Sequence, residues 1–110
     1  MRNIPEVSII IPYYKKKNYF QKTINSILNQ SFQNFEIIII YDDLNKSELG
    51  FIKKISNKNS KIRLIINNKN LGPGLSRNKG IFLSKGTYIA FCDADDIWKK
   101  NKLNLQIKFM

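Results

Sequence analysis

Five of the eight acidic residues in this 110-residue chain follow directly on two runs of apolar residues. They are Asp42, Asp43, Asp93, Asp95 and Asp96. Carboxylates that cluster at the ends of buried strands repel one another unless a cation lies between them. The pattern therefore favours a divalent metal ion that carries a phosphate-bearing ligand. The alternative is structural: Asp95 or Asp96 could simply cap the helix that follows.

The sequence contains no histidine and a single cysteine, Cys92. Without histidine, a metal ion has to be held by oxygen ligands, which favours Mg or Mn over Zn. A single cysteine cannot form an internal disulfide, and this is consistent with a reducing compartment. Because Cys92 lies on an expected strand, we predict that it is a core residue.

Length and composition are those of one small domain, residues 1–110, with 43% hydrophobic residues. The net charge of +11 indicates an anionic partner, although AT-rich codons could account for part of the lysine content. We find no signal pattern at the N-terminus and no apolar run of about 20 residues, so we expect no membrane span. We expect a cytoplasmic protein, and we keep open a peripheral contact with the cytoplasmic face of the inner membrane.

Apolar runs alternate with segments of helical periodicity along the whole chain. The expected strands are residues 7–11, 35–41, 62–66 and 88–92. The expected helices are residues 18–30, 49–55, 75–84 and a last one from residue 103 onward. Pro12 is expected to end the first strand, Asn18 and Gln21 to form a capping box, and Asp96 to cap the last helix.

This alternation predicts an α/β fold: a Rossmann-like parallel sheet of about four strands with helices on both faces. Ligands of such sheets bind beyond the carboxyl ends of the strands. The two aspartate clusters, the segment 12–17 and the glycine-containing loop 67–74 all lie at that edge. Four polar segments on one rim strengthen the interpretation as a metal and phosphate site.

Several motifs, in this order, resemble those of the family 2 glycosyltransferases. They are residues 7–14, 26–31, 35–43, 70–72 with 76–78, and 93–98. Each motif is weakly specific by itself, but together they cover almost the whole chain. The resemblance implies the N-terminal part of a GT-A fold, a nucleotide-diphosphate sugar donor such as a UDP-sugar, an Mn or Mg ion, and transfer with inversion.

The resemblance also implies roles for individual residues. Pro12 and Tyr13 would border the base and ribose, Asp43 would accept a hydrogen bond from the base, and Arg77 would hold the base or the diphosphate. Asp95 would ligate the metal ion, and Asp93 would touch the ribose or assist at the metal. The full expected donor site is Pro12, Tyr13, Tyr14, Asp42, Asp43, Gly72, Arg77, Asp93, Ala94 and Asp95, with Asp95 and Asp93 as metal residues.

The sequence departs from the family pattern in two places. Leu44 stands where the family has glycine after Asp43, which puts the shape of that loop in doubt. No residue can be assigned as the catalytic base. We expect the base, and the half of the protein that binds a saccharide or lipid-linked acceptor, to lie beyond Met110. Leu103, Ile107 and Met110 form an apolar stripe, and an exposed last helix of this kind could pair two chains.

The sequence fits three other protein classes less well. A receiver-type Mg-binding module would have paired acids after the first strand, where Pro12 and Tyr13 stand instead. A nucleic-acid-binding domain would gather its basic residues with aromatics on one face, whereas these lysines are spread along the chain. A nicotinamide-binding domain would have a G-x-G-x-x-G motif after the first strand. We therefore expect a glycosyltransferase of surface polysaccharide or lipooligosaccharide synthesis that does not bind nucleic acid. The alternative is a non-catalytic α/β module that binds a nucleotide with Mg, or nucleic acid.

Overall fold

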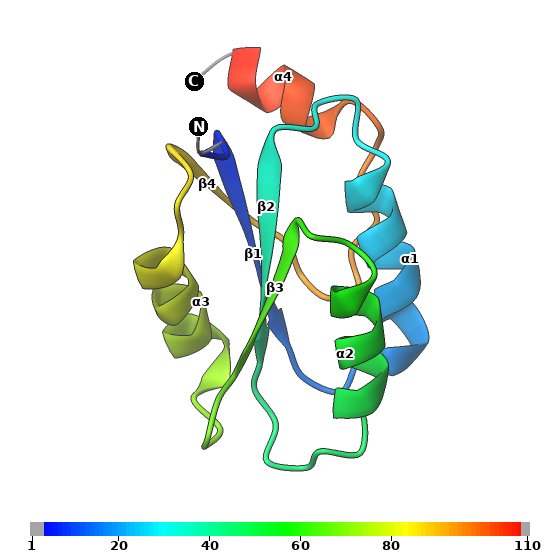
Figure 1. Cartoon of the computed structure of the whole chain (residues 1–110), viewed down its shortest axis with the longest axis vertical. Coiled ribbons are helices and arrows are strands. Elements are labelled where there is room, and N and C mark those ends of the chain that lie inside the picture. The colour runs from blue at the N-terminus through cyan, green and yellow to red at the C-terminus, as the bar shows by residue number, and fades with distance from the viewer. Residues whose placement is uncertain (1–3, 109–110) are drawn as a thin grey trace.

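A computed structural model describes residues 4–108. Its centre is a four-stranded parallel sheet in the order β3-β2-β1-β4 (Figure 1). The strands are β1 (Val7–Tyr13), β2 (Phe35–Tyr41), β3 (Ile62–Ile66) and β4 (Tyr88–Phe91). The predicted α/β class, with about four parallel strands, is confirmed.

β1 and β2 are the central strands, and nearly all of their residues are buried. Their β-branched isoleucines suit a strand that is covered on both faces. Ile9, for example, is paired with Ile37, and both are fully buried. The apolar runs of the sequence thus correspond to the middle of the sheet.

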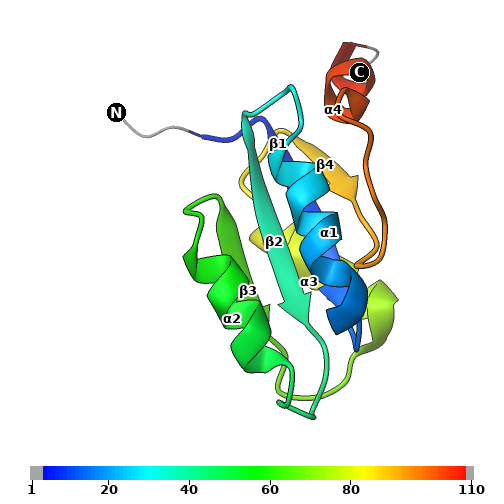
Figure 2. The same cartoon turned by 90° about the vertical axis from the view of Figure 1, so that its right-hand side faces the viewer.

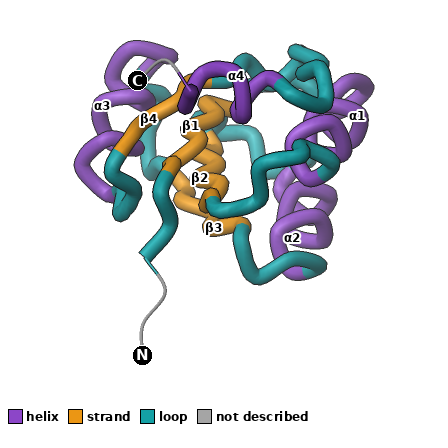
Figure 3. The backbone as a smooth tube through the Cα atoms, turned by 90° about the horizontal axis from the view of Figure 1, so that it is seen from above, coloured by secondary structure: helices purple, strands orange, loops and turns teal. Residues whose placement is uncertain are grey.

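Four helices follow the strands in alternation. They are α1 (Lys17–Leu28), α2 (Leu49–Asn57), α3 (Gly72–Leu83) and α4 (Lys102–Lys108). α1 and α2 cover one face of the sheet and α3 covers the other (Figures 2 and 3). α4 lies beyond the end of α1, where the Leu103 amide donates to Gln30 Oε1 at 3.1 Å. Within residues 4–108, no helix combines the length and apolarity needed to cross a membrane.

The core is divided by the sheet into two unequal parts. The larger part lies under α1 and α2 and includes Phe20, Ile24 and Ile27, which lie on one face of α1. The smaller part, under α3, is built on Ile10, Ile38 and Ile40. As predicted, Cys92 is a buried core residue, and Trp98 is buried as well.

The first strand runs two residues further than predicted, because Pro12 lies inside β1 and does not end it. The Ile10 carbonyl accepts from Cys92 on the β4 side, and the Tyr13 carbonyl accepts from Asp42 on the β2 side. Since successive residues of a strand alternate in direction, the Pro12 nitrogen faces the β4 side beyond Phe91, the last residue of β4. No ladder hydrogen bond is lost there, which makes proline tolerable.

The predicted helix caps are wrong. α1 begins at Lys17 without a side-chain cap, and Gln21 donates to Asn25 instead of closing a capping box. Asp96 lies six residues before α4 begins at Lys102, and its amide donates to the Asp93 carbonyl at 3.0 Å.

The stripe on the last helix is less exposed than expected. Leu103 is only 1% exposed, and Ile107 packs on the same core. Met110 lies outside the described residues. The exposed apolar surface of α4, through which we expected two chains to pair, is therefore smaller than the sequence indicated.

Candidate functional site

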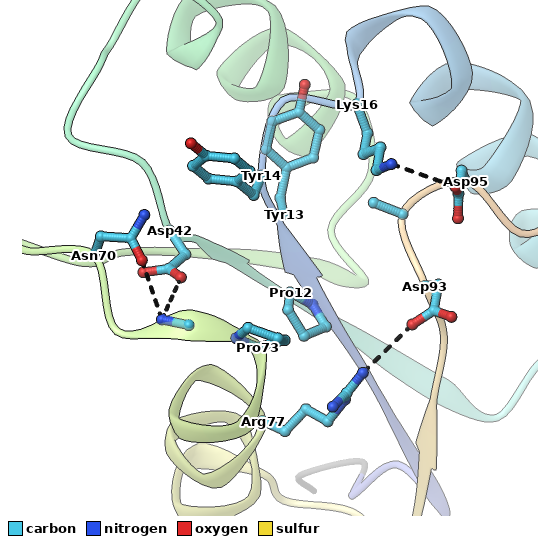
Figure 4. A pocket seen from close by; sticks show the side chains of 12 residues that line it. Pro12, Tyr13, Tyr14, Lys16, Asp42, Asn70, Pro73, Arg77, Asp93 and Asp95 are labelled. Atoms are coloured by element: carbon cyan, nitrogen blue, oxygen red, sulfur yellow. Dashed lines mark hydrogen bonds and ion pairs between the residues drawn. The ribbon is translucent and has the colours of Figure 1, made fainter.

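A cavity of about 500 Å³ lies at the carboxyl ends of the strands (Figure 4). We call it the carboxyl-edge pocket. It is lined by four segments of the chain, namely Pro12, Tyr13, Tyr14 and Lys16; Asp42; Asn70, Gly72, Pro73 and Arg77; and Asp93, Ala94 and Asp95. Its size is in the range of small-molecule sites, and its place is the edge at which parallel sheets bind ligands.

The two tyrosines at the end of β1 have different surroundings. Tyr13 is fully buried, stacks on Tyr41 with ring centroids 5.6 Å apart, and donates its hydroxyl to Glu48 Oε1. Burial and this hydrogen bond raise the pKa of the Tyr13 hydroxyl. Tyr14 is 46% exposed. Tyr14 is therefore the ring on this strand end that a flat ligand can stack on.

Each predicted metal residue is paired with a cation. Asp95 Oδ2 lies 3.5 Å from Lys16 Nζ, and Asp93 Oδ1 lies 3.5 Å from Arg77 Nη2 (Figure 4). These side chains are partly exposed, so the pairs contribute little to stability. The rim thus alternates carboxylates and cations around one opening, which suits a ligand that carries phosphates and a metal ion.

The loop that carries these carboxylates is attached firmly to α1. Thr23 Oγ1 donates to the Ala94 carbonyl at 3.0 Å, and Ser26 Oγ accepts from the Trp98 amide at 3.0 Å. Ala94 itself is 4% exposed. The small buried residue between the two aspartates therefore fixes the loop while the carboxylates on either side of it project to the rim.

The donor set fits a hard divalent ion. Among the described residues no three His, Cys, Asp or Glu side chains come together, so the protein by itself offers at most two carboxylates, Asp93 and Asp95. Mg characteristically binds through one or two carboxylates, with substrate phosphates and waters completing its octahedron. Two accessible carboxylates at the rim of a pocket match that pattern.

The two adjacent aspartates after β2, Asp42 and Asp43, form hydrogen bonds with different segments of the chain. Asp42 is 3% exposed and accepts from the amides of Leu71 and Gly72. Asp43 is 7% exposed, and its Oδ1 accepts from the Asn45 amide at 3.0 Å. Within residues 4–108, no hydrogen-bond donor reaches Asp43 Oδ2.

The structure brings nine of the ten predicted donor-site residues to the pocket, since only Asp43 lies outside its lining. Their individual roles remain predictions. Three further lining residues, Lys16, Asn70 and Pro73, were missed. Lys16 is the middle one of three consecutive lysines, a pattern typical of a solvated surface, and only its place directly after a strand could have singled it out.

The glycosyl transferase family 2 profile matches residues 8–110. The chain belongs to this family. A curated relative, an uncharacterized glycosyltransferase of Haemophilus influenzae, is 39% identical over 98% of this chain and 43% of its own length. A UDP-Glc:alpha-D-GlcNAc-diphosphoundecaprenol beta-1,3-glucosyltransferase of Escherichia coli is 42% identical over 94% of this chain. This chain spans 41% of that enzyme, so it corresponds to less than half the length of either relative.

Solved structures agree on the fold. Residues 1–349 of TarS from S. aureus superpose with a TM-score of 0.83 at 28% identity, over 94% of this chain and 32% of that one. TarS has been solved with UDP and with UDP-GlcNAc. A Pyrobaculum calidifontis mannosyltransferase, solved with GDP-Man and Mn²⁺, is similar in fold with a TM-score of 0.77 at 16% identity, over 86% of this chain and 28% of that one. The predicted match to the N-terminal part of a GT-A fold is thus confirmed.

Proposed function

We propose that this domain binds a nucleotide-diphosphate sugar, and specifically a UDP-sugar, as the donor of an inverting glycosyl transfer. The observation that carries the proposal is the carboxyl-edge pocket, where Asp93 and Asp95 face Arg77 and Lys16 around one opening. Family membership supports it, as do the UDP-linked ligands of TarS and the UDP-Glc donor named for the Escherichia coli relative.

The base and ribose would lie over the end of β1. Pro12 and the exposed ring of Tyr14 line that side of the pocket. Asp43 Oδ2, which has no hydrogen-bond donor among the described residues, is an acceptor for the imide N–H of a uracil. Tyr13 is buried, so it would support the base through the packing of β1 without stacking on it.

The diphosphate would lie between the two cations of the rim. Lys16 and Arg77 are held near the pocket by carboxylates at 3.5 Å, in weak and partly exposed pairs. An incoming diphosphate offers both cations a more highly charged partner at little cost, because exposed pairs of this kind are worth less than about 1 kcal/mol. Arg77 also has the planar fork that matches phosphate oxygens.

Asp95, with Asp93 beside it, would hold an Mn or Mg ion. When bound, this ion offsets the negative charge that develops on the diphosphate leaving group. The carboxylates are accessible and of the right type, and their neighbours Lys16 and Arg77 are free to turn toward the phosphates. Asp96 lies outside the pocket lining and takes no part.

The sugar acceptor is a substrate of the whole protein, of which this chain is the donor-binding part. We propose a saccharide or a lipid-linked saccharide, in the synthesis of a surface polysaccharide or lipooligosaccharide. Two relatives support this class: the Escherichia coli enzyme, whose acceptor is a diphosphoundecaprenol-linked sugar, and a putative teichuronic acid biosynthesis glycosyltransferase of Bacillus subtilis. The latter is 35% identical over 96% of this chain and 42% of its own length.

Ligand-observed NMR against a panel of nucleoside diphosphates and UDP-sugars, with Mg²⁺ or with chelator, tests the donor class. We expect UDP and UDP-sugars to show saturation transfer, strongest when Mg²⁺ is present, and ADP to show little. Equal signals from all bases would contradict a uridine site. No signal from any nucleotide would contradict donor binding by this domain.

A further inference from the structure

The loop between β3 and α3 is one wall of the carboxyl-edge pocket, and the buried carboxylate of Asp42 accepts hydrogen bonds from two of its backbone amides. We infer that Asp42 is a positioning residue: it fixes this loop and the start of α3 so that Arg77 faces the pocket, and it does not itself contact the nucleotide. The inference rests on the proposed donor site for its functional consequence. It assigns to Asp42 a different role from that of its neighbour Asp43.

The carboxylate of Asp42 is occupied by the protein. Oδ1 accepts from the Leu71 amide at 2.7 Å and from Asn67 Nδ2 at 3.0 Å, and Oδ2 accepts from the Gly72 amide at 2.8 Å. Hydrogen bonds from backbone amides to a carboxylate are among the stronger ones in proteins. With 3% of the residue exposed, Asp42 has its acceptor capacity directed at the loop (Figure 4).

Asn67 connects this carboxylate to α3. It is 1% exposed, and its amide group also donates to Ser76 Oγ at 3.2 Å. Its Oδ1 accepts from Lys79 Nζ at 2.8 Å. A chain of hydrogen bonds therefore runs from Asp42, at the end of β2, through Asn67, at the end of β3, to two residues of α3.

The backbone of the loop needs this attachment. Gly72 has φ +83°, in the left-handed region that favours glycine. In this conformation the amides of Leu71 and Gly72 both point at the one carboxylate. α3 begins at Gly72, and Arg77 lies about one and a half turns further on, so the direction of the first turn decides where its guanidinium points.

Loss of the Asp42 carboxylate should therefore weaken the binding of phosphate groups on the Arg77 side of the pocket. In Asp42→Asn the amide group would present N–H where the loop needs an acceptor. We expect amide hydrogen exchange at Leu71 and Gly72 to accelerate by at least about tenfold in the nucleotide-free protein, because charge-assisted bonds are lost. UDP affinity should fall by about tenfold as well, whereas uridine affinity should change little.

Two glycine variants of α3 complete the test. Gly72→Ala strains the loop through φ alone, since its Cβ would meet no atom within 4 Å, and we expect it to reproduce both effects of Asp42→Asn. Combining the two changes should add little, because both release the same loop. Gly74→Ala, two residues on, also has open space and an ordinary φ, so exchange and UDP affinity should stay as in the wild type.

The outcomes separate this inference from the proposed function. Unchanged exchange at Leu71 and Gly72 in Asp42→Asn would overturn the inference, and so would an equal loss of uridine and UDP affinity, which indicates direct contact with the base. If Asp42→Asn fails to fold, Gly72→Ala decides by the same two readouts. Absence of nucleotide binding by the wild type contradicts the donor site alone, because the exchange experiment needs no ligand.

Discussion

Glu36 at the start of β2 and Arg63 at the start of β3 form an ion pair, with Arg63 Nη2 2.9 Å from Glu36 Oε1. The pair lies at the edge of the sheet opposite the carboxyl-edge pocket. Glu36 is 7% exposed, and its Oε2 also accepts from Ser8 Oγ at 2.6 Å and from the Lys85 amide at 2.7 Å. One carboxylate thus connects β1, β2, β3 and the segment that leads into β4.

This network predicts acid sensitivity. Burial by itself would raise the pKa of Glu36, but the hydrogen bonds from Ser8 and Lys85 and the charge of Arg63 together lower it. A carboxyl whose pKa is lower in the folded state contributes stability above its unfolded pKa, and that contribution is lost as pH falls through the folded value. We expect Glu36→Gln to lower the free energy of unfolding at pH 7 by about 1–3 kcal/mol.

Urea unfolding at a series of pH values measures this effect. The difference between wild type and Glu36→Gln should shrink as pH falls below the ordinary range of glutamate. Glu6→Gln is the control, because no side-chain hydrogen bond of Glu6 is found among residues 4–108. A difference that is constant from neutral to acid pH would show that the charge of Glu36 is not the source of its stability.

Gly80 allows α3 to lie close to the sheet. A Cβ at this position would come within 2.5 Å of Ile10 Cγ2, and Ile10 is fully buried under α3. We expect Gly80→Ala to destabilise the fold, because overpacking costs about 1–3 kcal/mol and outweighs the roughly 1 kcal/mol gain in helix propensity.

Gly50→Ala in α2 is the matched control, since a Cβ there would meet nothing within 4 Å. It should leave the melting temperature unchanged or raise it, and Gly80→Ala should lower it. A higher melting temperature for both variants would mean that α3 can move away from the sheet at no cost.

Asp43 is the residue that should recognise the base. We expect Asp43→Ala to weaken uridine and UDP binding by the same factor, about tenfold, because the lost hydrogen bond to a charged acceptor belongs to the base. Asn45→Ala is the control: it removes the bond from the Ser47 amide to Asn45 Oδ1 but leaves the carboxylate in place. If Asp43→Ala lowers only UDP affinity, Asp43 acts on the phosphates and the assignment is wrong.

The strands could be predicted because their signal is local and strong. Two of the four predicted strands, residues 35–41 and 62–66, have the bounds that the sequence indicated, since continuous β-branched runs have few other uses. Pro12 was misjudged because the cost of a missing N–H depends on which neighbour it faces, and β4 ends before that point. The predicted capping residues were wrong because the caps of α1, α2 and α3 use no side-chain hydrogen bond, whereas the helix starts lie within three residues of the predicted ones.

The site was predictable where topology alone brings residues together. Parallel strands end at one edge, so Pro12, Asp42 and Asp95 had to lie near one another. The bonding of Asp42 and Asp43 could not be predicted, because adjacent residues of a strand end point to opposite faces and the partners come from distant loops. Asn67 gave no signal at all: its role depends on an amide that is buried between Asp42, Ser76 and Lys79.

The proposed donor site depends most directly on metal-assisted binding of uridine diphosphate at Asp95. Calorimetric titration of UDP, with Mg²⁺ and with excess chelator, should be carried out on the wild type, on Asp95→Asn and on Asp96→Asn. Asn keeps the shape of the side chain but removes the charge that the ion needs. We predict that Mg²⁺ strengthens UDP binding at least about tenfold in the wild type and in Asp96→Asn, and that Asp95→Asn loses most of this gain. Equal UDP affinity with and without Mg²⁺ in the wild type, or an unchanged gain in Asp95→Asn, would contradict the account.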